Sequence, residues 1–150
     1  LPTDPIGIYN VIFRGDFRFD GWPRSWCGYH TTLYTSTFPI NYIVVGDFST
    51  LLDPATATAC MIPPQQQSLL TNSIKDKTLS VDSLASNLVV QLAGTLTNYM
   101  GAWTFLDDTE IGTACRGQYG PVSIGGRIFL LQKLWLPRVG CTLTKVPPKW

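Results

Sequence analysis

The strongest repeating pattern of apolar residues in this chain runs over residues 81–98. Leucines recur there at every fourth position: Leu84, Leu88, Leu92 and Leu96. This spacing predicts one long helix with an apolar stripe that faces the core. Ser80 or Asp82 can cap its first turn. Gly94 costs about 1 kcal/mol relative to alanine inside a helix, so we expect another element to pack closely against it.

Segments rich in β-branched and aromatic residues predict strands on both sides of this helix. Residues 8–14 form the first, which we expect to be buried on both faces. Residues 27–34 alternate between apolar and polar, and residues 41–46 give the strongest strand pattern in the chain. The few turn-prone residues between these two segments predict an antiparallel hairpin. Residues 127–135 form a last apolar, strand-like segment that ends before Pro137.

These elements and the composition predict one α+β domain spanning residues 1–150, in which a mixed sheet with a hairpin packs on one central helix. Charged residues make up 14% of the chain and apolar residues 45%, which excludes a disordered protein. No apolar run approaches the roughly 20 residues of a membrane-spanning helix. We therefore expect a globular protein without a membrane span.

Four cysteines predict two disulfides. Cys27, Cys60, Cys115 and Cys141 are even in number and lack the close Cys-x-x-Cys spacing of zinc or redox sites. Three pairings are open, and we favour Cys27 with Cys60 and Cys115 with Cys141, because each bond then closes a local loop and contributes about 3–4 kcal/mol. The first bond would hold the irregular residues 47–76 against the hairpin. Disulfides indicate an oxidising compartment, and hence export.

Candidate catalytic and metal-binding groups are few. The chain has one histidine, His30, and one glutamate, Glu110, so we expect no zinc site and no cofactor. Asp107, Asp108 and Glu110 could form an acid–base or ligand cluster, but acidic residues in such a run more often begin a short helix. The chain has no Gly-x-Ser-x-Gly elbow to present a nucleophile to His30. We expect a protein that is not an enzyme, with a carboxylate-dependent hydrolase as the alternative.

Tryptophans on or beside the predicted loops are the candidate binding residues: Trp22, Trp26 and Trp103. Indole rings can stack on sugars or insert into a protein partner, and burial in the core is the alternative. The last 24 residues carry five positive charges and no acidic residue. Their wide spacing favours a solvated surface over a nucleic-acid site. Low charge and high apolar content also leave open a subunit that associates with copies of itself.

Short motifs follow one another in a specific order along the chain. They are Cys27-Gly-Tyr-His30, Leu92-Ala-Gly-Thr-Leu-Thr-Asn98, Ala114-Cys-Arg-Gly-Gln-Tyr-Gly120, and Gly126-Arg127 with Leu130-Leu131. Together they resemble the EXORDIUM or phosphate-induced protein 1 family of plants, over nearly the whole chain. The resemblance implies a secreted protein of the cell wall or apoplast that is linked to growth and has no established catalytic activity.

The same resemblance implies a zincin-like core without a metal site. Relatives outside plants that look like zinc proteases carry a His-Glu pair on the central helix, at positions occupied here by Val90 and Gln91. Family members also have a longer N-terminal region, so we expect this chain to be the later part of a larger, processed EXORDIUM-like domain. Its expected partners are wall or matrix polymers, other extracellular proteins or a second copy of itself.

Overall fold

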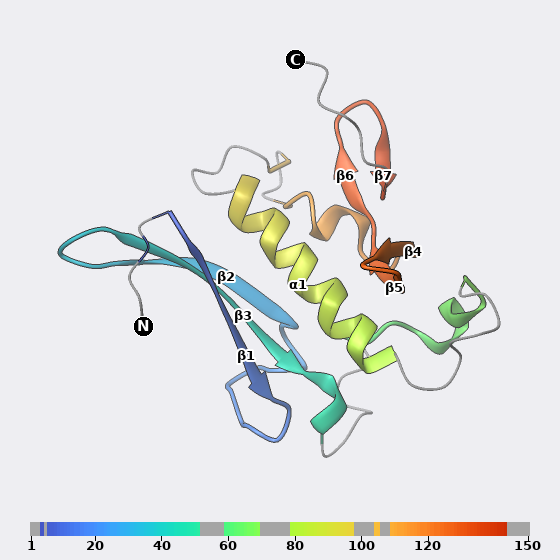
Figure 1. Cartoon of the computed structure of the whole chain (residues 1–150), viewed down its shortest axis with the longest axis horizontal. Helices are drawn as coiled ribbons and strands as arrows, with labels where there is room; N and C mark the ends of the chain where they lie inside the picture. Colours follow the sequence, from blue (N-terminus) through green and yellow to red (C-terminus); the bar gives the residue numbers. More distant parts are fainter. Residues whose placement is uncertain are drawn as a thin grey trace.

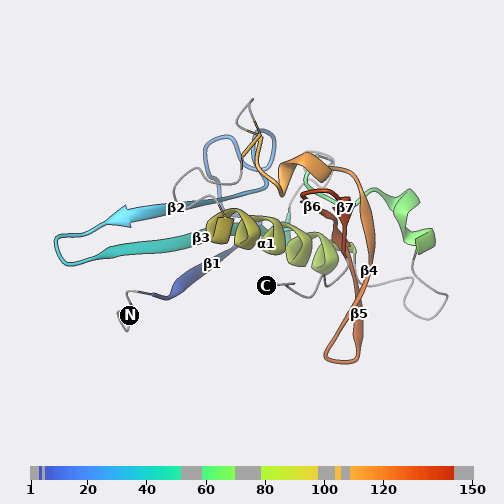
Figure 2. The ribbon, with the colours of Figure 1, turned by 90° about the horizontal axis from the view of Figure 1, so that it is seen from above.

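One helix, α1 (Leu79–Thr97), lies between a three-stranded sheet and two small hairpins (Figure 1). The view from above shows the first sheet on one side of α1 and the C-terminal hairpins on the other (Figure 2). This computed structural model describes residues 4, 6–51, 59–69, 79–97, 104–105 and 109–143. Within these residues the fold is the α+β arrangement predicted from the sequence.

The first sheet is mixed, with the strand order β1-β3-β2. β1 (Ile8–Arg14) runs parallel to β3 (Pro39–Asp47), and β2 (Gly28–Tyr34) pairs antiparallel with β3. The predicted hairpin is therefore confirmed. β3 is central, and its apolar residues 43–45 are buried as their pattern indicates.

The prediction that β1 is buried on both faces is wrong. Val11 and Ile12, which point to opposite faces of the sheet, are each about half exposed. β1 is an edge strand, so nothing in the described residues pairs with its outer side. The run of β-branched residues therefore predicted the strand β1, but it did not indicate that this strand lies at the edge of the sheet.

α1 begins and ends within two residues of the predicted helix, but its buried face differs from the leucine stripe. Leu84 and Leu88 pack against the core of the first sheet, whereas Leu92 and Leu96 are exposed. The opposite face of α1 is buried as well, and it carries Ser83 and Ser86. These serines are satisfied by backbone groups, which a pattern of apolar positions does not reveal.

Two short hairpins cover this second face of α1. β4 (Tyr119–Ile124) pairs antiparallel with β5 (Arg127–Gln132), and β6 (Leu134–Leu136) pairs with β7 (Gly140–Thr142). The single strand-like segment predicted at residues 127–135 is therefore split between two hairpins. Gly125 and Gly126 both have positive φ, as the tight turn between β4 and β5 requires.

Two disulfides and three short 3-10 helices complete the described part of the chain. Cys27 is bonded to Cys60 and Cys115 to Cys141, which is the pairing favoured from the sequence. The 3-10 helices are η1 (Phe48–Thr50), η3 (Pro64–Leu69) and η4 (Thr113–Cys115). Two disulfides fit an extracellular protein. Among the described residues, no helix has the length and apolar character needed to cross a membrane.

A carboxyl group is buried in the first turn of α1. Asp82 is 1% exposed, and its Oδ2 has no hydrogen-bond partner among the described residues. Burial raises the pKa of Asp82, while a hydrogen bond from the backbone of Leu130 lowers it in part. One of the two side chains considered as a helix cap is therefore buried next to the backbone of β5.

Replacing Asp82 with asparagine should stabilise the protein at neutral pH. The unfolded carboxyl ionises near pH 4, so the folded state, with its raised pKa, holds an extra proton between the unfolded and folded pKa values. The stability that this proton contributes is complete below the unfolded pKa and is lost as pH rises through the folded pKa. Asp82→Asn keeps an acceptor for Leu130 and removes the buried charge.

We expect Asp82→Asn to raise the free energy of unfolding by about 1–3 kcal/mol at pH 7 and to change it much less at pH 3. Urea unfolding at both pH values measures this difference. Asp16→Asn is the matched control, because Asp16 lies in an exposed ion pair with Arg14. An equal gain at both pH values would contradict the assignment of a buried, destabilising charge.

Candidate functional site

The face of the first sheet that points away from α1 is apolar and aromatic. The strand register places six side chains together on it: Tyr9, Val11, Tyr29, Thr31, Tyr42 and Val44. Side chains alternate between the two faces of a strand, and His30, next to Tyr29, contacts α1 through Gln91. The six therefore lie on the outer face, where an exposed sheet usually carries polar residues.

Aromatic rings continue from this face into the loop before β2. The Tyr29 ring centre is 6.3 Å from that of Tyr42 and 5.2 Å from that of Trp26. Trp26 is in turn 6.4 Å from Phe19. We call these four residues the aromatic row. Phe19 and Tyr29 are 44% and 39% exposed, so the row presents rings to the surroundings.

The aromatic row has polar groups but no charge at neutral pH. Burial raises the pKa of Tyr29, and the neighbouring Tyr42 raises it further through charge repulsion and a hydrogen bond. The Tyr29 phenol is therefore a neutral group that can donate and accept hydrogen bonds. The indole Nε1 of Trp26 already donates to the backbone oxygen of Asp20 at 2.8 Å.

The structure separates the three tryptophans that the sequence grouped as binding residues. Trp22 is 8% exposed, contacts Phe48 with its ring, and lies so close to Gly46 that a Cβ there would overlap the indole. It belongs to the core, which is the alternative that the sequence left open. Trp26 belongs to the aromatic row. Trp103 lies outside the described residues.

The chain's one histidine and one glutamate come together beside α1. Nε2 of His30 is 3.6 Å from Oε1 of Glu110, and Nδ1 of His30 is 2.9 Å from Oε1 of Gln91. Both ring nitrogens therefore face a side-chain oxygen of a neighbouring segment. This imidazole links β2 to α1 and to the segment before η4.

The acidic segment only partly falls within the described residues. Glu110 forms an isolated bridge with Thr104, and its backbone oxygen accepts hydrogen bonds from Thr113 and Ala114 in the turn that leads into η4. Asp107 and Asp108 lie outside the described residues. Within the described ranges, no group of three or more His, Cys, Asp and Glu side chains is placed to hold a metal ion.

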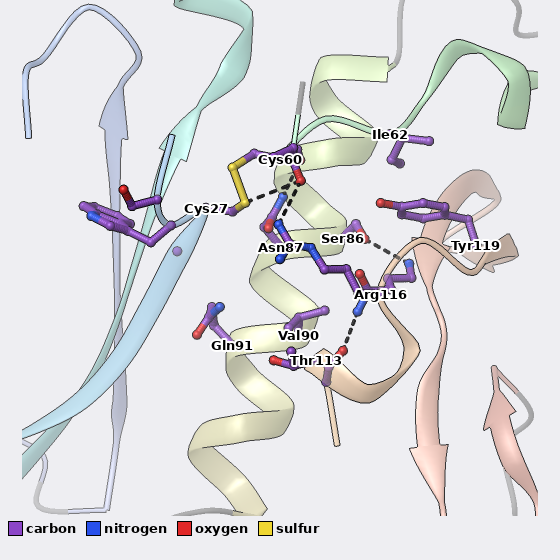
Figure 3. Close-up of a pocket in the computed structure, with 16 residues that line it drawn as sticks. Cys27, Cys60, Ile62, Ser86, Asn87, Val90, Gln91, Thr113, Arg116 and Tyr119 are labelled. Carbon is purple, nitrogen blue, oxygen red and sulfur yellow. Dashed lines mark hydrogen bonds between the residues drawn. A yellow bond between two sulfur atoms is a disulfide. The ribbon is translucent and has the colours of Figure 1, made fainter. Parts of the chain in front are cut away.

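A polar cavity of about 160 Å³ lies beside α1. Its walls are α1, the Cys27–Cys60 disulfide, η4 and the start of β4 (Figure 3). Val90 and Gln91, the positions at which the resemblance places a metal-binding pair in other proteins, both line it. Neither side chain suits a metal ion as that pair would.

Comparisons with known proteins identify no relative of this chain. No protein-family model matches it, no curated protein shows significant similarity to it, and no solved structure matches it at a significant level.

Sequence reasoning missed most of the aromatic row. The signal was the alternation within residues 27–34, which puts Tyr29 and Leu33 on the face opposite His30. β3 carries apolar residues on both of its faces, which indicates that the outer face of the sheet is apolar. Phe19 carries no such signal, because its loop follows no regular period.

Gly94 confirms the close packing expected of a glycine inside the helix. A Cβ at this position would overlap Cε1 of His30. The imidazole cannot turn aside without leaving Gln91 or Glu110. The side chain of His30 is therefore the reason that position 94 requires glycine.

Replacing Gly94 with alanine should destabilise the protein by about 1–3 kcal/mol, the usual cost of overpacking. In a His30→Ala background the same replacement should be neutral or stabilising, because alanine is the better helix former. Urea unfolding of the two single variants and the double variant gives the coupling between the sites. A stabilising effect of Gly94→Ala alone would show that His30 does not fill this space.

Proposed function

We propose that this chain is a secreted, non-catalytic module that binds extracellular polysaccharide on the outer face of its first sheet. The observation that carries the proposal is the partly exposed aromatic row on and beside a face where polar residues are expected. The two disulfides support an extracellular location. The resemblance to the EXORDIUM family adds the cell wall as the site of action and growth as the process.

The chemistry of the row favours a sugar polymer as the occupant. Sugar rings have apolar C–H faces and hydroxyl edges, so they suit an aromatic face with a polar group at its rim. Tyr29 and Tyr42 stand on adjacent strands, which hold their rings at a fixed spacing. The row carries no formal charge, which fits a neutral polymer better than an acidic one.

The resemblance to the EXORDIUM family also leads us to a proposal about the core of the protein. α1 and the first sheet form a zincin-like core whose metal-binding positions are occupied by Val90 and Gln91. The place of both residues in the wall of the cavity supports this.

A second copy of this chain is the second candidate occupant of the outer face. Aliphatic residues flank the aromatic row on the two edge strands, with Val11 exposed on β1 and Leu33 exposed on β2. Apolar edges of this kind can pair with another sheet. This alternative corresponds to a structural subunit of an extracellular fibre or matrix.

Replacing Tyr29 with alanine should weaken retention on insoluble polysaccharide. We expect a several-fold loss of affinity for microcrystalline cellulose or xylan, corresponding to about 1–2 kcal/mol for one stacked ring. Tyr34→Ala is the matched control. Tyr34 is on the same strand, points to the opposite face and is 79% exposed, so its loss should leave retention unchanged.

Light scattering on the same proteins distinguishes the two occupants. Polysaccharide binding predicts a wild-type protein that is retained on the polymer and whose mass does not depend on Tyr29. A dimer that becomes a monomer in Tyr29→Ala, with no retention of the wild type, would favour the second copy instead. Equal loss of retention in both tyrosine variants would contradict a role for the outer face.

A further inference from the structure

The cavity beside α1 contains one cation among neutral polar groups. Arg116 lines it, and none of the described residues in its wall is acidic. Burial raises the pKa of Tyr119, while the charge of Arg116 lowers it in part. Both wall cysteines are joined as a disulfide. At neutral pH the cavity therefore carries one positive charge.

The Arg116 guanidinium has hydrogen-bond donors to spare. It extends across the cavity toward Asn87 (Figure 3). Among the described residues, its only hydrogen bond is a long contact of 3.4 Å from Nη2 to the backbone oxygen of Ala59. A guanidinium has five N–H donors in a planar fork. Such a group matches the two oxygens of a carboxylate.

Asn87 has a fixed orientation that leaves an acceptor available. Its Nδ2 donates to the backbone oxygens of Cys60, at 3.0 Å, and Ser83, at 2.8 Å. Both amide hydrogens are therefore used, and Oδ1 remains as the acceptor. A ligand hydroxyl is the natural donor for it.

The size of the cavity limits the ligand to a small molecule. Its volume of about 160 Å³ is well below the range of roughly 300–1,000 Å³ found for drug-sized ligands. Val90 and Ile62 add apolar surface to the wall. A ligand with one short carbon chain or one sugar ring fits this volume.

We infer that this cavity binds a small hydroxycarboxylate. The carboxylate pairs with the guanidinium of Arg116, and a hydroxyl group donates to Oδ1 of Asn87. Trp26 of the aromatic row also lines the cavity, but the two proposed contacts, Arg116 and Asn87, do not belong to the row. Its test is therefore independent of the proposed binding of polysaccharide.

The test titrates the whole chain with lactate and glucuronate by calorimetry. The matched controls are lactamide, which lacks the carboxylate, and propionate, which lacks the hydroxyl. We expect a Kd of about 1 mM or tighter for at least one hydroxycarboxylate. Lactamide and propionate should each bind several-fold more weakly than lactate. Saturable binding of neither acid, or equal binding of lactate and lactamide, would overturn the inference.

Two arginine variants test whether the ligand binds in the cavity. Arg116→Gln should weaken binding of the acid about tenfold or more, the effect of losing a hydrogen bond to a charged group. Arg127→Gln removes the same charge from the exposed start of β5 and should change affinity less than about twofold. Equal weakening by both variants would show nonspecific attraction and overturn the site. If Arg116→Gln fails to fold, the wild-type comparison of lactate with lactamide still decides.

Discussion

The arrangement of this protein depends on hydrogen bonds between polar side chains of α1 and backbone groups of two other segments. Ser86 Oγ accepts from the backbone nitrogen of Gln132 on β5, and Ser83 Oγ accepts from that of Ile62, each at 2.9 Å. Asn87 adds its bond to the backbone of Cys60. A buried backbone group left without a partner costs about 1–3 kcal/mol. These bonds therefore fix where the second half of the chain meets the helix, and with it the shape of the cavity.

Local patterns predicted the elements of this fold better than their surroundings. The period of residues 81–98 gave α1, and the alternation around the hairpin gave β2 and β3, because side-chain periodicity follows directly from backbone geometry. The disulfide pairing followed from the short loops that each bond closes. The second buried face of α1 could not be read in this way. The sequence does not distinguish a serine that accepts a hydrogen bond from a buried backbone nitrogen from a serine exposed to water.

The candidate site was harder to predict, because its residues are brought together by the path of the loops. Trp22 and Trp26 are close in sequence, yet one is buried against Gly46 and Phe48 and the other joins the aromatic row. His30 and Glu110 are far apart in sequence and meet beside α1. Residue type gave the chemistry of these groups, but their burial and partners depended on contacts that periodicity does not specify.

β2 connects the two faces on which ligands are proposed to bind. Tyr29 points outward into the aromatic row, whereas His30 points inward to Gln91, which lines the cavity. Neighbouring residues of a strand point to opposite faces, so a single substitution on β2 can change one face while leaving the side chains of the other in place. Coupling between the faces would have to pass through the strand itself. A packed strand held by β3 on one side and by His30 against α1 resists such a shift.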